Sequence, residues 1–488
     1  MAEDKDKKQE KPTEKIEVEA KISVKKDGQE IASDEIIEEF VGAPAKALDK
    51  TVEATKTVGK VVSGTGPVKK ARQYWTILGP GLTTGASDDD PSGIATYSQT
   101  GAGWGYKFLW LAPLTFPLMA VIQEMCARIG MVTGRGLAGN IKRYFPRWVL
   151  ILCTILLFVA NTFNIGADLG AMSEALRLFW PRLDYFILII IIAIIVLLMQ
   201  IFMPYNRYAR YLKWLALVLF SYVLSTLLIK GLNWHEILIA SIKPSFSFTR
   251  DQILIVTGVL GTTISPYLFF WQTSQEVEEK IEDGDRSIEE RKEDIGSKDI
   301  EEMRIDVWSG MFLSNLVMFF IIAACAGTLH VAGISAINSA GQAASALRPL
   351  AGDYSYLLFA VGIIGVGALG IPVLAGSSSY AIAESFGWKQ GLHYKLNQAY
   401  AFYGMIIISL MVGVLINLVG INAIKALVYA AVMNGCVAPV VLILILILGS
   451  NKKVMGGRAN GAWSNIIGGL ATFLMTIAGL ATIWSLMT

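Results

Sequence analysis

The residues best suited to chemistry lie in one short stretch, GASDDDPSGIAT, at residues 85–96. Three consecutive aspartates and a proline interrupt a run, roughly residues 75–100, that is otherwise apolar enough to form a membrane helix. Unpaired carboxylates and broken backbone are both costly in hydrocarbon, so acids inside a membrane span are usually functional. Carboxylate oxygens and freed backbone carbonyls are ligands for a hard cation. The stretch therefore predicts a cation site near mid-membrane.

The three aspartates do not all have the same explanation. Asp90 followed by Pro91 has the pattern of an acidic N-cap with proline at the first helical position, so a second half-helix is expected to start there. This structural role accounts for one aspartate only. Asp88 and Asp89 are predicted to line the ion pathway, either in a hydrated vestibule or in direct contact with the metal.

Composition places these residues in a polytopic membrane protein. Of the 488 residues 53% are hydrophobic, mean hydropathy is +0.50, and several uncharged runs are long enough to span a bilayer. The net charge of +2 and the balance of acids and bases give no support for a nucleic-acid partner. The four cysteines are scattered singly, and no Walker or GxGD motif is present. We therefore predict no enzyme activity and no cofactor, with the lipid bilayer as the surroundings.

The chain divides into two predicted regions. Residues 1–72 form a charged cytoplasmic tail, expected to be disordered apart from a short amphipathic helix near residues 45–62. Residues 73–488 form the transmembrane domain, with a charged cytoplasmic loop at about 278–303. Eleven helical spans are predicted, at roughly 75–100, 106–130, 148–177, 183–203, 208–230, 251–275, 305–329, 354–386, 395–419, 421–449 and 461–486.

The distribution of Lys and Arg between loops predicts the orientation. With a cytoplasmic N-terminus, the inner loops carry 19 Lys and Arg and the outer segments carry 8, in addition to those of the tail. Cytoplasmic loops are the ones enriched in Lys and Arg. The expected arrangement is a multi-pass protein of the cell membrane with its N-terminus inside and its C-terminus outside.

A second span is also interrupted, and its position matters. The sixth span, VTGVLGTTISPYLFFWQTSQEVEE, is expected to break around residues 262–267, five spans after the break at Asp90–Gly93. Interrupted spans at matching places in two five-helix halves indicate an inverted-repeat transporter with its substrate at mid-membrane. No residue-level identity joins the halves, so this prediction rests on topology.

Several ordered motifs resemble one family. GPGLTTGASDDDPSGIATYSQTGAGWGYKFLW, ARIGMVTGRGLA, NTFNIGADLG and LAGSSSYAIAESFG are similar to segments of the Nramp family of divalent-metal transporters, from Trp75 to the C-terminus. The resemblance implies an all-α, LeuT-like inverted repeat of helices 1–5 and 6–10, with helices 1 and 6 broken. In that family the breaks read Asp-Pro-Gly-Asn and Met-Pro-His, where this chain has Asp90-Pro91-Ser92-Gly93 and Ser265-Pro266-Tyr267. The metal-binding set implied here is Ser87, Asp90, Gly93, Thr262 and Ser265.

The departures from the family pattern bear on the metal. A methionine thioether favours transition metals over Mg²⁺ and Ca²⁺, so Ser265 in its place removes a filter against hard ions. Loss of the Asn side chain at Gly93 is expected to widen the site, which suits an ion such as Mg²⁺ that keeps several waters. These substitutions resemble the Nramp-related magnesium transporter branch.

The departures also bear on proton coupling. The resemblance places Asn161, Asp168 and Ala171 on the third helix where Glu, Asp and Glu are usual, and Tyr267 at the histidine position. Asn161, Asn164 and Asp168 share one helical face, which is expected to line the polar interior. The predicted transport pathway consists of Asp88, Asp89, Asn161, Asn164, Asp168, Tyr267 and Asn434.

The sequence thus predicts a secondary transporter that imports divalent metal ions, Mg²⁺ and Mn²⁺, by alternating access and without proton coupling. One alternative is a proton-coupled Mn²⁺ or Fe²⁺ importer of the mainstream Nramp type. A more remote alternative is a cation-coupled carrier of an organic solute with the same broken-helix architecture.

Overall fold

The computed structural model describes residues 24–26, 29–31, 79–202, 220–285, 287–293 and 295–487. The chain separates into two compact units, Met1–Thr76 and Ile77–Thr488. In the first unit, strands β1 (Val24–Lys26) and β2 (Gln29–Ile31) pair antiparallel, a feature that the sequence analysis did not anticipate. The helix predicted near residues 45–62, and the disorder predicted for the rest of the tail, fall outside the described residues.

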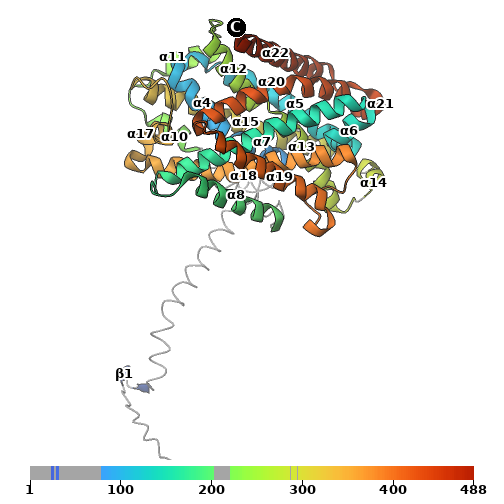
Figure 1. Cartoon of the computed structure of the whole chain (residues 1–488), viewed down its shortest axis with the longest axis horizontal. Helices are drawn as coiled ribbons and strands as arrows, with labels where there is room; N and C mark the ends of the chain where they lie inside the picture. Colours follow the sequence, from blue (N-terminus) through green and yellow to red (C-terminus); the bar gives the residue numbers. More distant parts are fainter. Residues whose placement is uncertain are drawn as a thin grey trace, which may run out of the picture. The chain divides into compact units, whose positions relative to one another are not determined.

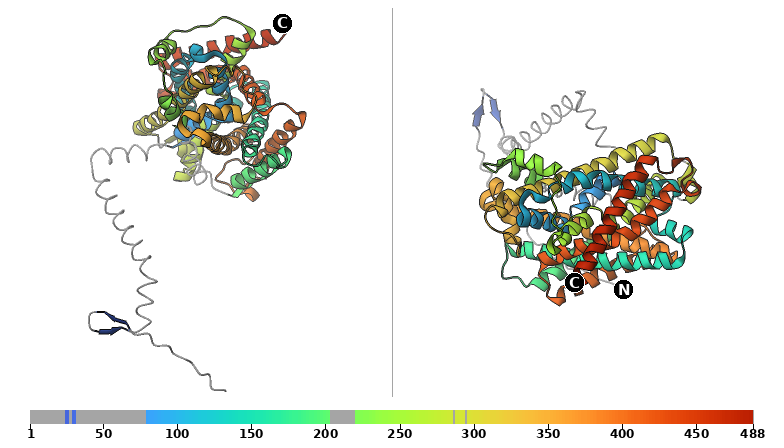
Figure 2. Two further views of the ribbon diagram at one scale, coloured as in Figure 1. Left: turned by 90° about the vertical axis from the view of Figure 1, so that its left-hand side faces the viewer. Right: turned by 90° about the horizontal axis from the view of Figure 1, so that it is seen from above.

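The described part of the second unit is helical throughout (Figures 1 and 2). Its longer helices are α3 (Pro80–Asp88), α4 (Pro91–Trp104), α5 (Leu111–Thr133), α7 (Arg147–Arg177), α8 (Tyr185–Phe202), α10 (Phe220–Leu228), α11 (Trp234–Ile242), α12 (Arg250–Thr263), α13 (Pro266–Asp283), α15 (Ser297–Cys325), α18 (Ser355–Phe386), α19 (Tyr400–Ile416), α20 (Ala423–Ser450) and α22 (Ala462–Met487). Short helical turns connect them: η1 (Gly105–Phe108), α6 (Leu137–Tyr144), α14 (Ile288–Glu293), η3 (Ala326–His330), α16 (Ala340–Ala344), η4 (Ser345–Leu347), α17 (Arg348–Ala351), η5 (Gly352–Tyr354), η6 (Leu396–Gln398), η7 (Asn417–Val419), α21 (Lys452–Met455) and η8 (Gly456–Arg458).

Nine helical stretches among the described residues are long and apolar enough to cross a membrane. The first predicted span, α3 of 9 residues and α4 of 14 residues, is absent from these nine because three consecutive aspartates lie at its centre, whereas α12 and α13 count as one stretch across their break. The fifth predicted span is represented only by α10, since residues 203–219 lie outside the described part of the chain. The fold is therefore all-α and polytopic, and the count of eleven spans stays a prediction.

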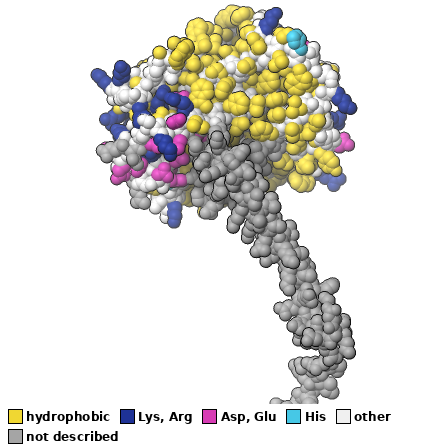
Figure 3. All heavy atoms as spheres, turned by 180° about the vertical axis from the view of Figure 1, so that it is seen from behind, with side chains coloured by type: hydrophobic (Ala, Val, Ile, Leu, Met, Phe, Trp, Pro, Cys, Tyr) yellow, Lys and Arg dark blue, Asp and Glu magenta, His cyan; other side chains and the backbone are white. Residues whose placement is uncertain are grey.

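The molecular surface fits a bilayer environment. Figure 3 shows hydrophobic side chains gathered across the middle of one face, with Lys and Arg at its two ends. Helix α8, at the front in Figure 1, also exposes apolar side chains, including those of Ile187, Ile190 and Ile194. Hydrocarbon chains solvate such side chains and polar headgroups solvate the charged ends.

Both predicted helix breaks are present. The first lies at Asp89 and Asp90, between α3 and α4, so Pro91, Ser92 and Gly93 already belong to the second half-helix and the break is earlier than expected. The second lies at Ile264 and Ser265, between α12 and α13. The charged loop predicted at 278–303 is shorter than expected, because α13 continues to Asp283 and α15 begins at Ser297.

The half-helix α3 is held against α15 by two features. A Cβ added to Gly85 or to Gly310 would overlap the backbone of the opposite helix, so glycine permits their close approach. At the start of α3, the carboxylate of Asp306 accepts hydrogen bonds from the backbone N–H groups of Gly79, Gly81 and Leu82, at 2.9, 2.6 and 2.9 Å. An acid from α15 thus caps a helix whose own N-cap, Gly79, has no side chain to do so.

The close crossing of α3 and α15 gives a stability prediction. We expect Gly310→Ala to lower the melting temperature of the detergent-purified protein by several degrees, since its methyl group would meet the backbone of Gly81. Gly404→Ala in α19 is the matched control, because no atom lies within 4 Å of its added Cβ. Equal melting temperatures for the two variants would show that the crossing tolerates a side chain.

Candidate functional site

Asp90 occupies the start of α4, as the sequence predicted. Its Oδ1 accepts hydrogen bonds from Ser92 Oγ at 2.6 Å and from the backbone N–H of Gly93 at 2.9 Å. Pro91 takes the first helical position, where its missing N–H costs nothing. One carboxylate oxygen of Asp90 is thereby committed to the helix cap.

The other oxygen of Asp90 joins three helices. Asp90 Oδ2 accepts a hydrogen bond from Asn164 Nδ2 of α7 at 2.9 Å, and the hydroxyl of Tyr267 on α13 lies 3.3 Å away. The same hydroxyl lies 3.1 Å from the carbonyl oxygen of Ser87 in α3. A hydroxyl has one proton, so Tyr267 can donate fully to only one of the two acceptors. The carboxylate is fully buried and has four donors around it.

Gly93 and Thr262 face each other across the two helix breaks. A Cβ on Gly93 would lie 3.2 Å from both the carbonyl oxygen of Asp88 and Thr262 Oγ1. Thr262 Oγ1 is buried and has no hydrogen-bond partner. Two oxygens therefore border the place of the absent side chain, and the widening expected at Gly93 stays a prediction. What the glycine provides is access to two oxygens.

The remaining members of the predicted metal-binding set, Ser87 and Ser265, hydrogen-bond to backbone carbonyls of the preceding helical turn. Ser265 Oγ lies 2.7 Å from the carbonyl oxygens of both Gly261 and Thr262 in the last turn of α12. Ser87 Oγ donates to the carbonyl of Thr83 at 2.8 Å, one turn earlier in α3. Each hydroxyl gives its proton to a backbone carbonyl, which leaves oxygen lone pairs available to a cation.

The predicted polar face of α7 is only partly at the site. Asp168 is fully buried, and neither of its carboxyl oxygens has a hydrogen-bond partner. A Cβ on Gly370 of α18 would lie 3.1 Å from Asp90 Cβ and 4.0 Å from Asp168 Oδ2, so the two acids border the same glycine. Asn161 turns elsewhere: its amide nitrogen lies 3.0 Å from the carbonyl of Leu374 in α18.

The other predicted pathway residues have distinct surroundings. Ser314 Oγ of α15 lies 2.6 Å from Asp88 Oδ2 and 3.3 Å from Asp89 Oδ1. Asn434 is buried in α20 with both amide atoms lacking a partner, and no hydrogen bond links it to Asp90. Sequence reasoning missed Ser314 and Gly370. The signal for Ser314 was its position beside Asn315, a polar pair within the apolar run MFLSNLVMFF.

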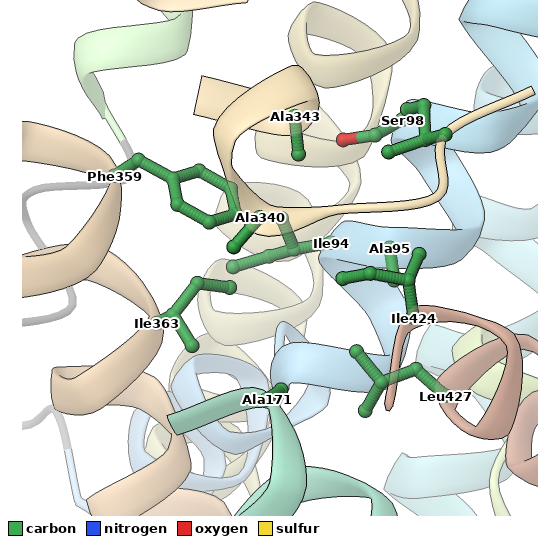
Figure 4. Close-up of a pocket in the computed structure, with 11 residues that line it drawn as sticks. Ile94, Ala95, Ser98, Ala171, Ala340, Ala343, Phe359, Ile363, Ile424 and Leu427 are labelled. Atoms are coloured by element: carbon green, nitrogen blue, oxygen red, sulfur yellow. The ribbon is translucent and has the colours of Figure 1, made fainter. Parts of the chain in front are cut away.

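The two ends of the helical unit differ in openness. Beyond α4, on the side of α16, apolar side chains leave a cavity of only about 10 Å³ (Figure 4), lined mainly by Ile94, Ala95, Phe359, Ile363, Ile424 and Leu427. Toward the opposite end of α18 lies a cavity of about 960 Å³, bordered by Ser274, Glu278, Tyr380 and Glu384.

The larger cavity follows one face of α13. Tyr267, Trp271, Ser274 and Glu278 are spaced at helical intervals, so they lie in a row from Asp90 to the cavity. Trp271 is fully buried, and its ring centroid lies 6.2 Å from that of Tyr380. The Trp271 indole therefore separates the buried carboxylate from the open end.

Comparison with known proteins identifies the family. The family model described as "Natural resistance-associated macrophage protein-like" (Nramp) matches residues 81–485. The chain belongs to the Nramp family. Similar relatives include the divalent metal cation transporter MntH of Pectobacterium carotovorum, 25% identical over 82% of this chain and 92% of its own length. The MntH of Bacillus subtilis is 24% identical over 88% of this chain and 97% of its own length.

Solved structures share the fold of this Nramp chain. The manganese transporter of Eremococcus coleocola superposes with a TM-score of 0.66 at 17% identity, covering 84% of this chain and 87% of that one. A Na⁺-coupled sialic acid symporter superposes with a TM-score of 0.52 at 13% identity, covering 84% and 89%. The architecture is the LeuT-like one, with broken first and sixth helices meeting at Asp90. These relatives are membrane transporters rather than enzymes.

The site geometry predicts that the charge of Asp90, more than its capping role, supports metal uptake. Asp90→Asn keeps an N-cap side chain, whereas Asp90→Ala also removes the cap, at a cost of about 1 kcal/mol. We expect both variants to fold and both to lose saturable metal uptake in liposomes. Near-normal uptake by a well-expressed Asp90→Asn protein would contradict the assignment.

Proposed function

We propose that this Nramp-family protein imports divalent metal cations, Mg²⁺ and Mn²⁺, by alternating access and without proton coupling. The observation that carries the proposal is the buried carboxylate of Asp90 at the meeting point of the two helix breaks. The relatives named as divalent metal cation transporters support the ion class. The choice of Mg²⁺ beside Mn²⁺ rests on the ligand types of this chain.

The donor set around the proposed ion is hard. The Asp90 carboxylate is an oxygen ligand, and the N–H groups of Gly93 and Asn164 that donate to it orient it without binding the ion themselves. Ser265 supplies a hydroxyl oxygen at the second break, where a thioether would favour softer ions. Thr262 Oγ1 and the Asp88 carbonyl add two further oxygens beside Gly93. Mg²⁺ and Mn²⁺ both accept such ligands.

Binding of an ion to Asp90 requires one of its four donors to leave. The Tyr267 hydroxyl is the longest of the four contacts, at 3.3 Å, and it has the Ser87 carbonyl as a second acceptor at 3.1 Å. Tyr267 can therefore release Asp90 without losing its own hydrogen bond. We infer that its hydroxyl moves to the Ser87 carbonyl when the metal binds.

The direction of transport follows from the charge distribution and the cavities. The Lys and Arg counts support an orientation with the 960 Å³ cavity facing the cytoplasm, which we propose together with an inside N-terminus and an outside C-terminus. In this state the outer route is closed by apolar side chains and the inner route by Trp271. A divalent ion entering a cell gains about 4.6 kcal/mol per 100 mV of membrane potential, which suffices for uptake without a second gradient.

The surroundings of Asp168 support uncoupled transport. Asp168 makes no hydrogen bond within the described part of the chain, and Asn161 on the same helix is bonded to α18. A proton relay needs a continuous series of donors and acceptors, which these residues do not provide. Asp168 is placed instead to offer a second carboxylate to a hydrated ion near Asp90.

Two alternatives lead to different measurements. The first is a proton-coupled Mn²⁺ or Fe²⁺ importer of the mainstream Nramp type, which would acidify the vesicle lumen; the relatives named as divalent metal cation transporters are compatible with it. A cation-coupled organic-solute carrier is favoured only by the shared fold of the sialic acid symporter. The carboxylate at the break would repel an anionic solute, so we place this alternative last.

The hard donor set predicts weak discrimination between Mg²⁺ and Mn²⁺. In liposome uptake we expect Mg²⁺ to compete with Mn²⁺ within about tenfold, a difference below about 1.4 kcal/mol. Ser265→Cys introduces sulfur with little change in volume and should shift the preference toward Mn²⁺. Ser265→Ala is the control, because it removes the oxygen without adding a soft ligand. Mn²⁺ uptake that ignores a large excess of Mg²⁺ would favour the mainstream alternative.

The absence of a relay predicts metal entry without proton entry. A pH-sensitive dye trapped in liposomes should report no metal-dependent acidification during Mg²⁺ or Mn²⁺ uptake with the membrane potential clamped. Asp168→Asn should slow uptake modestly without changing its driving force. Acidification in the wild-type protein that disappears in Asp168→Asn would establish a proton path and overturn the uncoupled mechanism.

A further inference from the structure

We propose that Asp88, Asp89 and Ser314 form a second divalent-cation site, on the α15 side of the first helix break and separate from Asp90. The ion class rests on the proposed function, and the site itself rests on the contacts around the two carboxylates.

The two acids converge on a single hydroxyl. Ser314 Oγ lies 2.6 Å from Asp88 Oδ2 and 3.3 Å from Asp89 Oδ1, and all three side chains are buried. Asp88 Oδ1 is buried as well and has no hydrogen-bond partner. One hydroxyl proton is therefore the only donor that these contacts provide for two carboxyl groups.

Comparison with Asp90 shows how incomplete this environment is. The Asp90 carboxylate has four donors, from Ser92, Gly93, Asn164 and Tyr267. Asp88 and Asp89 share a single donor, the Ser314 hydroxyl. Buried carboxylates are normally paired with a cation or bound to a metal. Asp88 and Asp89 have fewer partners than Asp90, so a bound cation would stabilise them more.

Charge determines the kind of ligand. Within the described residues, no Lys, Arg or His forms an ion pair with Asp88 or Asp89. Two adjacent carboxylates in the membrane interior are neutralised by one divalent cation. Their oxygens and the Ser314 hydroxyl are hard ligands, and Mg²⁺ sites commonly use one or two carboxylates.

Asp88 is positioned to belong to both sites. Its carbonyl oxygen faces Gly93 and Thr262, whereas its carboxylate contacts Ser314. Two ions that share Asp88 in this way would repel each other. Occupation of the second site would weaken binding at Asp90 and speed release, as multi-site occupancy does in channels.

Counting bound ions tests the proposal. Equilibrium binding of Mn²⁺ to the full-length protein in nanodiscs should give two ions per chain, with magnetic dipolar broadening of the Mn²⁺ EPR spectrum. Asp90→Asn should retain one ion and lose the broadening. Ser314→Ala and Asp89→Asn should each also fall to one ion, or weaken the second by at least tenfold.

The matched control is Ser379→Ala in α18, a buried serine whose hydroxyl donates to the Ala375 carbonyl. It should keep two ions. One ion in the wild-type protein, or two ions in a correctly folded Ser314→Ala protein, would overturn the second site. Mg²⁺ transport in liposomes is a separate measurement. Its failure would reject the proposed function, whereas the number of bound ions alone tests the second site.

Discussion

The cost of holding carboxylates inside a membrane shapes the centre of this protein. An isolated charge in hydrocarbon costs at least about 2.5 kcal/mol, and the chain places four acids within or beside the first helix break. Asp90 is stabilised because three helices bring donors to it, from Ser92 and Gly93 in α4, Asn164 in α7 and Tyr267 in α13. The packing of those helices therefore depends on the hydrogen bonds that the Asp90 carboxylate accepts.

The two helix breaks leave backbone groups at the ends of the half-helices, and nearby side chains satisfy some of them. Between α12 and α13, the Ser265 hydroxyl satisfies carbonyls at the end of one half-helix, and Pro266 begins the next without an unused N–H. Between α3 and α4, Asp90 accepts the Gly93 N–H at the start of the second half-helix, and Pro91 takes its first position. Glycines at Gly85 and Gly310 let the surrounding helices approach closely enough to exclude lipid from these polar ends.

Sequence reasoning located the breaks because they depend on local chemistry. Proline, an acidic cap and glycine act through neighbouring residues, so Asp90-Pro91 and Ser265-Pro266 could be read directly. Contacts between distant segments could not. Ser314 lies more than 220 positions from Asp88, and nothing in the sequence says which face of α15 meets α3. The closeness of Thr262 to Gly93 could not be predicted for the same reason, since it is set by helix packing. Asn161 shared the predicted face of α7 with Asn164, yet packing directs it to α18.

The cap that Asp306 places on α3 has a mechanical consequence. Rotating α3 away from α15 would strip three backbone amides of their acceptor and leave a carboxylate without its donors, each loss costing about 1–3 kcal/mol. Helix α3 is therefore expected to travel with α15 as one rigid lever, bending at Asp89 and Asp90. A route to the 960 Å³ cavity would then open by displacement of α18 and its Tyr380 from Trp271, while α3 and α15 keep their contacts with each other.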